Sequence, residues 1–406
     1  DAFASLSVVD LKVQDDLTVT DDASIGGDAA VTGALTGGTV NGAGILADTT
    51  NFVDSILISQ DAGTGTLSSA SENTGLGNDV FNVLTSGVRC TAVGSSAGAA
   101  LTTASEATLI GRQAGLALTS GNSNTFIGGR SGAATTTGTE NTAIGQGSLF
   151  TNSTGSSNTA LGRGTLLSNT TASNNTAVGK NSLNLNTTGT KNTAVGATAL
   201  DANTTADDNT AVGFDSLGAN TTGSANTAVG REAMEANTTG ANNTALGCAA
   251  LAVQTTASNN TAIGFNAMLA NTTGANGVAV GFNSLDANTT GIRNTAVGAF
   301  SLGDNTTGGD NVAIGNSALE QNTTASNNTA GTDNVAMGHR ALGANTTGGL
   351  NTAIGNDALD ANTTASNNTA LGFAALGANT TGADNVAVGR NAYDANTTGH
   401  SGVAIG

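Results

Sequence analysis

The chain is 406 residues long, which ordinarily corresponds to roughly two or three globular domains. Its composition argues against such domains: there are 58 glycines, no tryptophan or proline, one tyrosine and 10% charged residues, whereas ordinary cores depend on large apolar side chains. The net charge of −18 excludes nucleic acid and anionic membranes as favoured partners. A hydrophobic fraction of 38% argues against disorder, so cohesion must come from regular backbone pairing and small residues.

The chain begins with a lead-in, residues 1–10, followed by a six-residue repeat over residues 11–36. The repeat reads L-K-V-Q-D-D, L-T-V-T-D-D, A-S-I-G-G-D, A-A-V-T-G-A, so two apolar residues per short strand alternate with polar turns. Such hexads suit a left-handed β-helix or an intertwined trimeric β-prism, and the prism is favoured because partner chains cover its strand edges. Residues 37–72 follow neither period, and we expect them to form a junction that caps the first full coil.

A 17-residue repeat organises the rest of the chain. The unit N-T-A-V-G and its variants recur with their last glycine, the marker glycine, every 17 residues, apart from one step of 23. The marker glycines are Gly77, Gly94, Gly111, Gly128, Gly145, Gly162, Gly179, Gly196, Gly213, Gly230, Gly247, Gly264, Gly281, Gly298, Gly315, Gly338, Gly355, Gly372, Gly389 and Gly406. Seventeen residues are too few for a helical hairpin. The β-branched residues and the Gly and Asn corners predict an all-β, parallel β-solenoid (β-roll) with two short strands per coil, forming a rod of roughly 95 Å.

The repeat array has an internal boundary near residue 145. The early coils, residues 73–144, carry glycine where the main array, residues 145–406, carries leucine, and leucine where it carries asparagine. The core must therefore change its cross-section at this boundary. The 23-residue step gives an irregular coil near residues 328–334, which we expect to bulge as a surface loop or to distort the coil.

Stacked coils place each residue over its counterpart in the next coil, so the repeat defines columns. The Asn that opens each N-T-T, replaced in one coil by Gln254, is expected to form a ladder of side-chain amides. Two aliphatic columns, one with Val178 and Val195 and the other with Leu183 and Leu200, are expected to fill the coil. The Ala between Thr and Val then faces outward, and this small apolar face predicts contact among three identical chains.

The units N-T-A-V-G at 192–196 and S-G-V-A-I-G at 401–406 resemble the head repeats of trimeric autotransporter adhesins. With the preceding L-T-V-T-D-D-A-S-I-G-G-D segment and the N-T-T-G repeats, residues 11–406 are similar to the shafts of bacteriophage tail fibres and related virion appendages. The resemblance implies a left-handed β-roll in a homotrimer at a virion or cell surface. No autotransporter-type membrane anchor or coiled-coil stalk is visible, and the chain stops on a repeat unit, so we expect a tip, chaperone or anchor beyond Gly406.

No catalytic, cofactor-binding or metal-binding residues are predicted. His339 and His400 have no partners at metal-site or triad spacing. Acidic residues such as Asp201 are interpreted as a solvated face, with calcium-binding turns as the alternative. Cys90 and Cys248 lie about nine coils, or roughly 43 Å, apart, so we expect two unpaired thiols.

Basic residues gather directly after the marker glycines, in a corner column that they share with phenylalanines. The basic members are Arg112, Arg163, Lys180, Arg231, His339 and Arg390, and the aromatic members are Phe214, Phe265, Phe282 and Phe373. The column predicts either a receptor-facing stripe with cation–π pairs or long side chains that cover grooves between chains.

These features predict a non-enzymatic, structural shaft of a trimeric fibre that holds a host-contacting tip away from a virion or cell. Its expected partners are two further copies, an attachment protein on the virion or cell, and a host receptor reached through a C-terminal region. No run of 18 apolar residues predicts membrane insertion. An adhesin acting through its repeat surface is the alternative. An ice-binding solenoid is a third, weakened because Thr187 and Thr188 face opposite sides of a strand.

Overall fold

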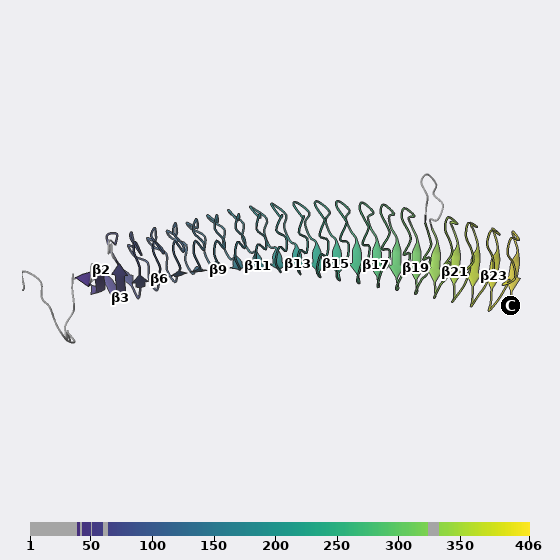
Figure 1. The fold of residues 1–406 in the computed structure, drawn as a ribbon, viewed down its shortest axis with the longest axis horizontal. Coiled ribbons are helices and arrows are strands. Elements are labelled where there is room, and N and C mark those ends of the chain that lie inside the picture. Colours follow the sequence, from purple (N-terminus) through teal and green to yellow (C-terminus); the bar gives the residue numbers. More distant parts are fainter. Residues whose placement is uncertain (1–38, 41–42, 50, 60–63, 324–332) are drawn as a thin grey trace, which may run out of the picture.

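The computed structural model describes residues 39–40, 43–49, 51–59, 64–323 and 333–406, and this part of the chain is all-β, without a helix. The predicted lead-in and hexads, up to residue 36, lie outside the described residues. The coils stack into a long, gently curved rod, and each adds one strand to a continuous parallel sheet (Figure 1). The predicted parallel β-solenoid of 17-residue coils is confirmed.

Each described coil contributes one strand of three residues. These strands are β5 (Thr74–Leu76), β6 (Thr91–Val93), β7 (Thr108–Ile110), β8 (Thr125–Ile127), β9 (Thr142–Ile144), β10 (Thr159–Leu161), β11 (Thr176–Val178), β12 (Thr193–Val195), β13 (Thr210–Val212), β14 (Thr227–Val229), β15 (Thr244–Leu246), β16 (Thr261–Ile263), β17 (Val278–Val280), β18 (Thr295–Val297), β19 (Val312–Ile314), β20 (Val335–Met337), β21 (Thr352–Ile354), β22 (Thr369–Leu371), β23 (Val386–Val388) and β24 (Val403–Ile405). The prediction of two strands per coil is wrong. A coil this short must turn repeatedly, and three non-glycine residues in a typical coil, for example Thr198, Leu200 and Asp208, adopt positive φ angles that no strand accommodates.

An antiparallel hairpin precedes the first coil. Strand β1 (Thr39–Val40) pairs with β2 (Ala43–Thr49), which pairs with β3 (Phe52–Ser59). Strand β3 then joins the parallel stack through β4 (Ala70–Ser71) and β5. Because Leu57 of β3 has no exposed surface, the hairpin covers apolar side chains at the open end of the solenoid.

The middle residue of each strand points into the coil, and the two outer residues point away from it. From β9 to β23 the middle residue is an alanine with no exposed surface, as at Ala194 and Ala211. Val195, in contrast, is 36% exposed. The predicted inward Val column and outward Ala column are therefore wrong, because alternation shows which residues share a face but not which face is buried. The second predicted column, with Leu183 and Leu200, is buried as expected.

Early and late coils place their large side chains differently. In late coils a buried leucine such as Leu149 stands four residues after the marker glycine, and the strand contributes only alanine. In three early coils that place is glycine (Gly98, Gly115 and Gly132), and the neighbouring strand residues Leu109 and Phe126 are large. A Cβ on Gly132 would lie 2.5 Å from the ring of Phe126, and a Cβ on Gly98 would lie 2.8 Å from Leu109. The large and small positions are thus exchanged near residue 145, so that the interior stays filled.

The predicted amide ladder runs through the interior of the rod. In this NTT ladder, formed by the Asn that opens each N-T-T, Nδ2 of Asn203 donates to Oδ1 of Asn186 at 2.8 Å. Asn220 donates in turn to Asn203 at 3.2 Å. Gln254 continues the ladder in both directions. These side chains have no exposed surface, so the ladder prediction is confirmed.

A second buried amide column, which the sequence analysis missed, is the Asn before T-A-V. In this NTA ladder the backbone N–H of Asn209 donates to Oδ1 of Asn192 at 3.0 Å. The two ladders meet at one carbonyl per coil: the Ala206 oxygen accepts from Nδ2 of Asn192 at 2.8 Å and from Nδ2 of Asn203 at 3.1 Å. The side-chain amides therefore satisfy a buried corner carbonyl that the sheet does not reach.

The 23-residue step leaves the stacking intact. Strand β19 pairs with β20 in the usual register, Val312 opposite Val335. The NTT ladder also crosses the step, because Asn345 donates to Asn322 at 3.1 Å. The additional residues thus enter between the two ladders; residues 324–332 themselves lie outside the described residues.

The marker glycines meet two constraints that exclude a side chain. Gly196 has a φ of +140°, which glycine alone adopts readily, and a Cβ there would lie 2.2 Å from the carbonyl oxygen of Gly213 in the next coil. Gly147 differs, although its φ is +65°. A Cβ at Gly147 would meet only Leu167, at 3.6 Å, and Thr198 occupies the equivalent place in a later coil.

We therefore expect Gly196→Ala to lower the free energy of unfolding by roughly 2–4 kcal/mol, from left-handed strain and overpacking together. The matched variant Gly147→Ala should lower it by no more than about 1–2 kcal/mol, because only the strain remains. Urea denaturation followed by circular dichroism measures both. Equal losses would show that contact between marker glycines does not limit the stacking.

We also expect Asn203→Ala to cost roughly 2–4 kcal/mol, because it leaves two neighbouring amides and the Ala206 carbonyl short of partners. Asn203→Gln, which copies Gln254, should cost clearly less. Amide hydrogen exchange in the adjoining coils measures the local effect. Equal loss of protection in both variants would mean that packing volume, rather than amide bonding, matters at this position.

Candidate functional surfaces

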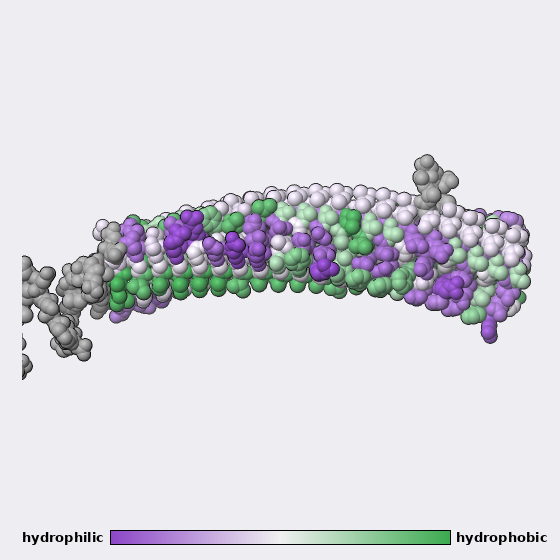
Figure 2. Space-filling view, viewed as in Figure 1, coloured by the Kyte–Doolittle hydropathy of each residue, from purple (hydrophilic) through white to green (hydrophobic). Residues whose placement is uncertain are grey.

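The most extended surface feature is the aliphatic ridge, defined as the third residue of every strand from β5 to β24. This residue is Val, Ile, Leu or Met in every coil, from Leu76 to Ile405. The ridge stands outward, with Leu161 44% and Leu371 46% exposed. Figure 2 shows this ridge as a regular hydrophobic band along the lower edge of the N-terminal and middle parts of the rod. A contiguous row of exposed apolar side chains of this kind usually marks an interaction surface.

The strand face that carries the ridge is uncharged. The first residue of each strand from β5 to β24 is Thr or Val, and the third is aliphatic, so none of these twenty strands contains an acidic or basic residue. The whole chain has a net charge of −18, but its charged side chains do not lie in these strands. Two such faces can approach each other without direct like-charge contact.

The corner column lies at the turn that follows each strand, and its predicted members project outward. Arg390 places its guanidinium 5.5 Å from the ring centroid of Phe373, so one predicted cation–π pair is present. Phe265 and Phe282 stack at 5.5 Å between centroids. Phe300, one place further along its coil and missed by the sequence analysis, meets Phe282 edge-on at 5.3 Å. The aromatic members therefore form a continuous exposed cluster over three coils.

His339 and His400 lie in different coils and contact different groups. His339 lies 4.0 Å from Asp357 through Nδ1, and Nδ1 of His400 accepts the backbone N–H of Ala383 at 3.0 Å. Burial, and secondarily the neighbouring Asp215, raise the pKa of Asp201. Among the described residues no three His, Cys, Asp or Glu side chains gather in a group able to hold a metal ion.

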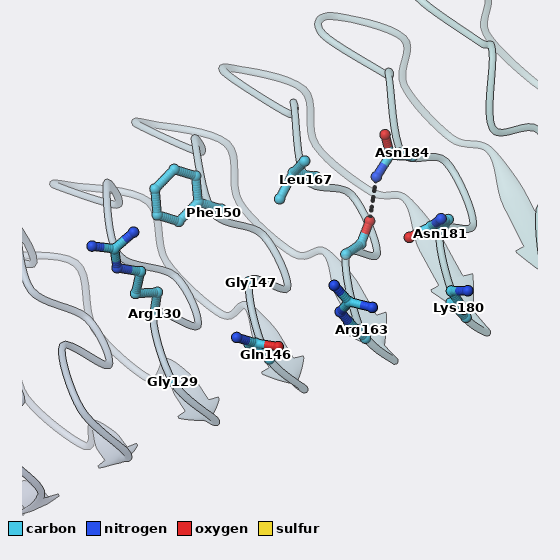
Figure 3. A pocket seen from close by; sticks show the side chains of 11 residues that line it. Gly129, Arg130, Gln146, Gly147, Phe150, Arg163, Leu167, Lys180, Asn181 and Asn184 are labelled. Carbon is cyan, nitrogen blue, oxygen red and sulfur yellow. Dashed lines mark hydrogen bonds between the residues drawn. The ribbon is translucent and has the colours of Figure 1, made fainter.

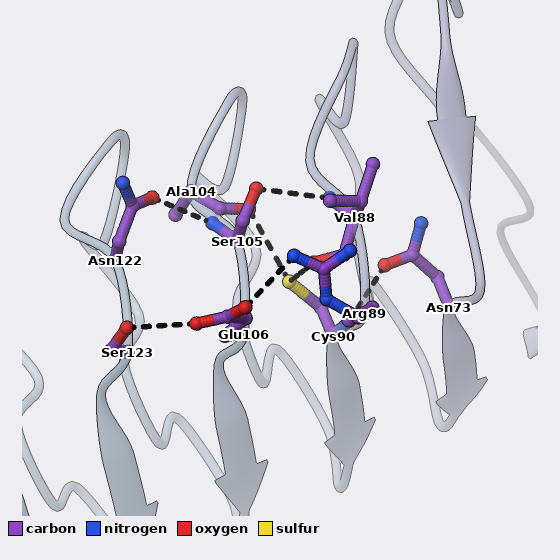
Figure 4. A network of polar contacts seen from close by, with 9 residues as sticks. All are labelled: Asn73, Val88, Arg89, Cys90, Ala104, Ser105, Glu106, Asn122 and Ser123. Carbon is purple, nitrogen blue, oxygen red and sulfur yellow. Dashed lines mark hydrogen bonds and ion pairs between the residues drawn. The ribbon is translucent and has the colours of Figure 1, made fainter.

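The two cysteines are unpaired, as predicted, and occupy different surroundings. Cys90 replaces an asparagine of the NTA ladder: its N–H donates to Oδ1 of Asn73 at 2.9 Å, and its thiol donates to the Ala104 carbonyl at 3.3 Å (Figure 4). Burial raises the pKa of the Cys90 thiol. Cys248 is half-buried in the corner column, with Sγ 3.5 Å from Nη2 of Arg231.

An exposed chain of polar contacts runs along the rod beside Cys90 (Figure 4). Arg89 pairs with Glu106 at 2.8 Å, and Oγ of Ser123 donates to Glu106 at 3.1 Å. The hydrogen bond from Arg89 lowers the pKa of Glu106. Because all three lie at the surface, where solvent screens the charges, these contacts align neighbouring coils without adding much stability.

A scan against protein-family models and a search of curated proteins found no match to this chain. No helix that could span a membrane occurs in the described residues.

The thiols provide a test of the coil structure. We expect a maleimide reagent to modify Cys248 at least about tenfold faster than Cys90, because a buried thiol of raised pKa presents little thiolate. Mass spectrometry of peptides from timed reactions measures both rates, with the urea-unfolded chain as the control in which they converge. Equal rates in the folded protein would contradict the burial of Cys90.

Proposed function

We propose that the chain is a non-catalytic structural shaft in which three copies pack side by side through their aliphatic ridges to form a stiff extracellular or virion fibre. The exposed ridge on an uncharged strand face carries this proposal. The contact surface differs from the one inferred from the sequence, since the alanine column is buried inside each coil. Three chains around one axis give every ridge a partner in a closed arrangement.

The periodicity of the ridge favours a second copy of this chain as its occupant. The aliphatic residues recur once per coil along the whole rod, so a partner must present apolar groups at the same rise to stay in register. A second copy of this chain has that rise by construction. A globular partner would match only a few coils and leave the rest of the ridge in water.

The interior explains why such a fibre would be stiff. Consecutive coils are joined by parallel strand pairing and by both amide ladders, and breaking any coil contact would expose buried amides. A rod with these properties suits the task of holding a host-contacting tip away from a virion or cell. The resemblance of its repeats to tail-fibre shafts supports this setting.

The alternative is an adhesin that binds through its repeat surface, and the exposed Phe265–Phe282–Phe300 cluster favours it. An ice-binding face receives less support. The first Thr of most N-T-T units uses its hydroxyl within the rod, as where Oγ1 of Thr187 donates to the Thr204 carbonyl at 2.9 Å.

The deciding experiment measures native mass by light scattering and shape by small-angle scattering. We expect an elongated particle of three times the 39.0 kDa chain mass. The triple variant Val195→Lys, Val212→Lys and Val229→Lys should weaken or abolish the trimer, because burying three charges in an apolar contact is costly.

The matched control is Thr188→Lys, Thr205→Lys and Thr222→Lys, which adds the same charges to exposed positions away from the strand face. This control should remain trimeric. A monomeric wild-type chain would contradict the shaft proposal and favour the adhesin. A trimer unaffected by the ridge variant would place the interface elsewhere.

A further inference from the structure

Residues 107–200 differ in charge from the rest of the rod. This stretch contains one acidic residue, Glu140, and five basic residues: Arg112, Arg130, Arg163, Lys180 and Lys191. Residues 201–406 contain fifteen acidic and four basic residues, and the whole chain carries −18. The basic side chains are therefore concentrated in a short part of an acidic rod, where they create a local positive potential.

Three of these basic residues border a single hollow of about 460 Å³ that spans four coils (Figure 3). This volume falls in the range of roughly 300–1,000 Å³ that is usual for ligand pockets. Arg130 lies at one end, and Arg163 and Lys180 lie toward the other. Among the described residues none forms an ion pair with any of the three, and the polar contact that Arg130 makes is with Oε1 of Gln113, at 3.0 Å.

The hollow exists because two consecutive coils lack a side chain at one place. Gly147 and Gly164 occupy the second position after the marker glycine, with φ of +65° and +66°. The coils on either side carry Arg130 and Asn181 there, at +60° and +57°. The backbone thus accepts other residues at this place, and a Cβ at Gly147 has ordinary room. A Cβ at Gly164 would lie 2.7 Å from Oδ1 of Asn181, which is the end of a side chain rather than backbone. The turn itself therefore requires neither glycine, and their effect is to open this hollow, called the trough below.

The trough combines cations with an apolar wall and amide groups. Phe150 and Leu167 line the side opposite Arg163, as Figure 3 shows. Gln146 and Asn184 also line it, and Asn184 donates through Nδ2 to the Gly164 carbonyl at 2.7 Å. An aromatic or aliphatic wall suits the apolar face of a sugar ring, amides suit its hydroxyls, and the cations suit anionic substituents.

We propose that this trough binds a short segment of an acidic polysaccharide, with Arg130, Arg163 and Lys180 holding its anionic groups and Phe150 contacting a sugar ring. Carboxylate and sulfate substituents offer the cations the same chemistry. The trough depends on the coil structure alone. It can bind a polysaccharide whether or not three chains form a shaft, so either proposal can be wrong without the other.

The surroundings of the trough favour a polysaccharide over a nucleic acid. Nucleic-acid affinity rests on many phosphate contacts along an extended basic track. The basic stretch here is short, and the residues after it are predominantly acidic. One aromatic side chain lines the trough, whereas single strands are usually held by several stacking platforms.

The test is fluorescence anisotropy of the full chain with labelled oligogalacturonate, labelled sulfated dextran, neutral dextran and a short single-stranded DNA. We expect binding to at least one anionic glycan, no binding to neutral dextran, and weaker binding to DNA. Which glycan binds more tightly then separates carboxylate from sulfate recognition. Added salt should weaken the binding, because the cations are exposed.

Three variants locate the site. The double variant Arg163→Gln, Lys180→Gln should weaken glycan binding at least about tenfold. Gly147→Gln, which fills the trough without altering charge and copies Gln113 of an earlier coil, should weaken it similarly while circular dichroism stays unchanged. Lys191→Gln removes a nearby charge outside the trough and should change affinity less than about twofold.

Three outcomes of the glycan measurements would overturn the proposal. These are the absence of glycan binding, an equal loss in Lys191→Gln, which would indicate diffuse charge attraction, and undiminished binding by a folded Gly147→Gln. Tighter binding to DNA than to either glycan would reject a polysaccharide in favour of a nucleic acid. Because the oligomeric mass is measured separately, failure of this site is distinguishable from failure of the trimeric shaft.

Discussion

The buried corner carbonyl is the constraint on which this structure depends. A 17-residue coil has one short strand, so most of its backbone groups cannot pair within the sheet. Water does not reach the backbone groups that point into the rod, and these groups therefore need hydrogen-bond partners from the protein itself. The Ala206 carbonyl illustrates the solution, since it accepts from Asn192 of the preceding coil and from Asn203 of its own. An unpaired carbonyl in this place would cost about 1–3 kcal/mol. The two asparagines of each late repeat are therefore interior residues, and the two ladders that they form hold consecutive coils in register.

The same constraint explains where the repeat tolerates change. The 23-residue step adds its extra residues between the two ladders and preserves both. Gln254 replaces Asn without breaking the column, and Cys90 supplies a thiol donor to the carbonyl that an amide would bind. In the early coils, where leucine replaces the asparagine of N-T-T, the apolar interior compensates with Leu109 and Phe126. The repeat tolerates a substitution where the buried corner carbonyl still accepts a hydrogen bond, or where apolar side chains fill the interior in place of the asparagine.

Much of this architecture could be predicted from the sequence, because stacking copies the period directly into space. The 17-residue coil, the NTT ladder and the Leu183 column followed from counting alone. The buried face of the strand did not follow from counting, because alternate residues share a face and either of the two faces could point inward. A usable signal was present: the middle strand residue becomes Leu109 or Phe126 in the coils where Gly98 and its counterparts replace leucine. That compensation identifies the middle residue as buried, because only residues that share an interior need to exchange volume.

The trough could not be predicted in this way, because it forms at two coils whose residues differ from the repeat pattern and is not a property of the repeat itself. Gly147 and Gly164 are unremarkable in so glycine-rich a sequence, and only the φ angles of their counterparts show that the turn does not require them. The corner residues project outward and make no contribution to either ladder, so they vary freely from coil to coil. The strand face keeps an aliphatic residue in all coils. A continuous face suits a partner as long as the rod, whereas a local departure at the corner suits a ligand a few coils long. The two surfaces therefore favour partners of different size, and a fibre can carry a binding site along its length without interrupting the contact that assembles it.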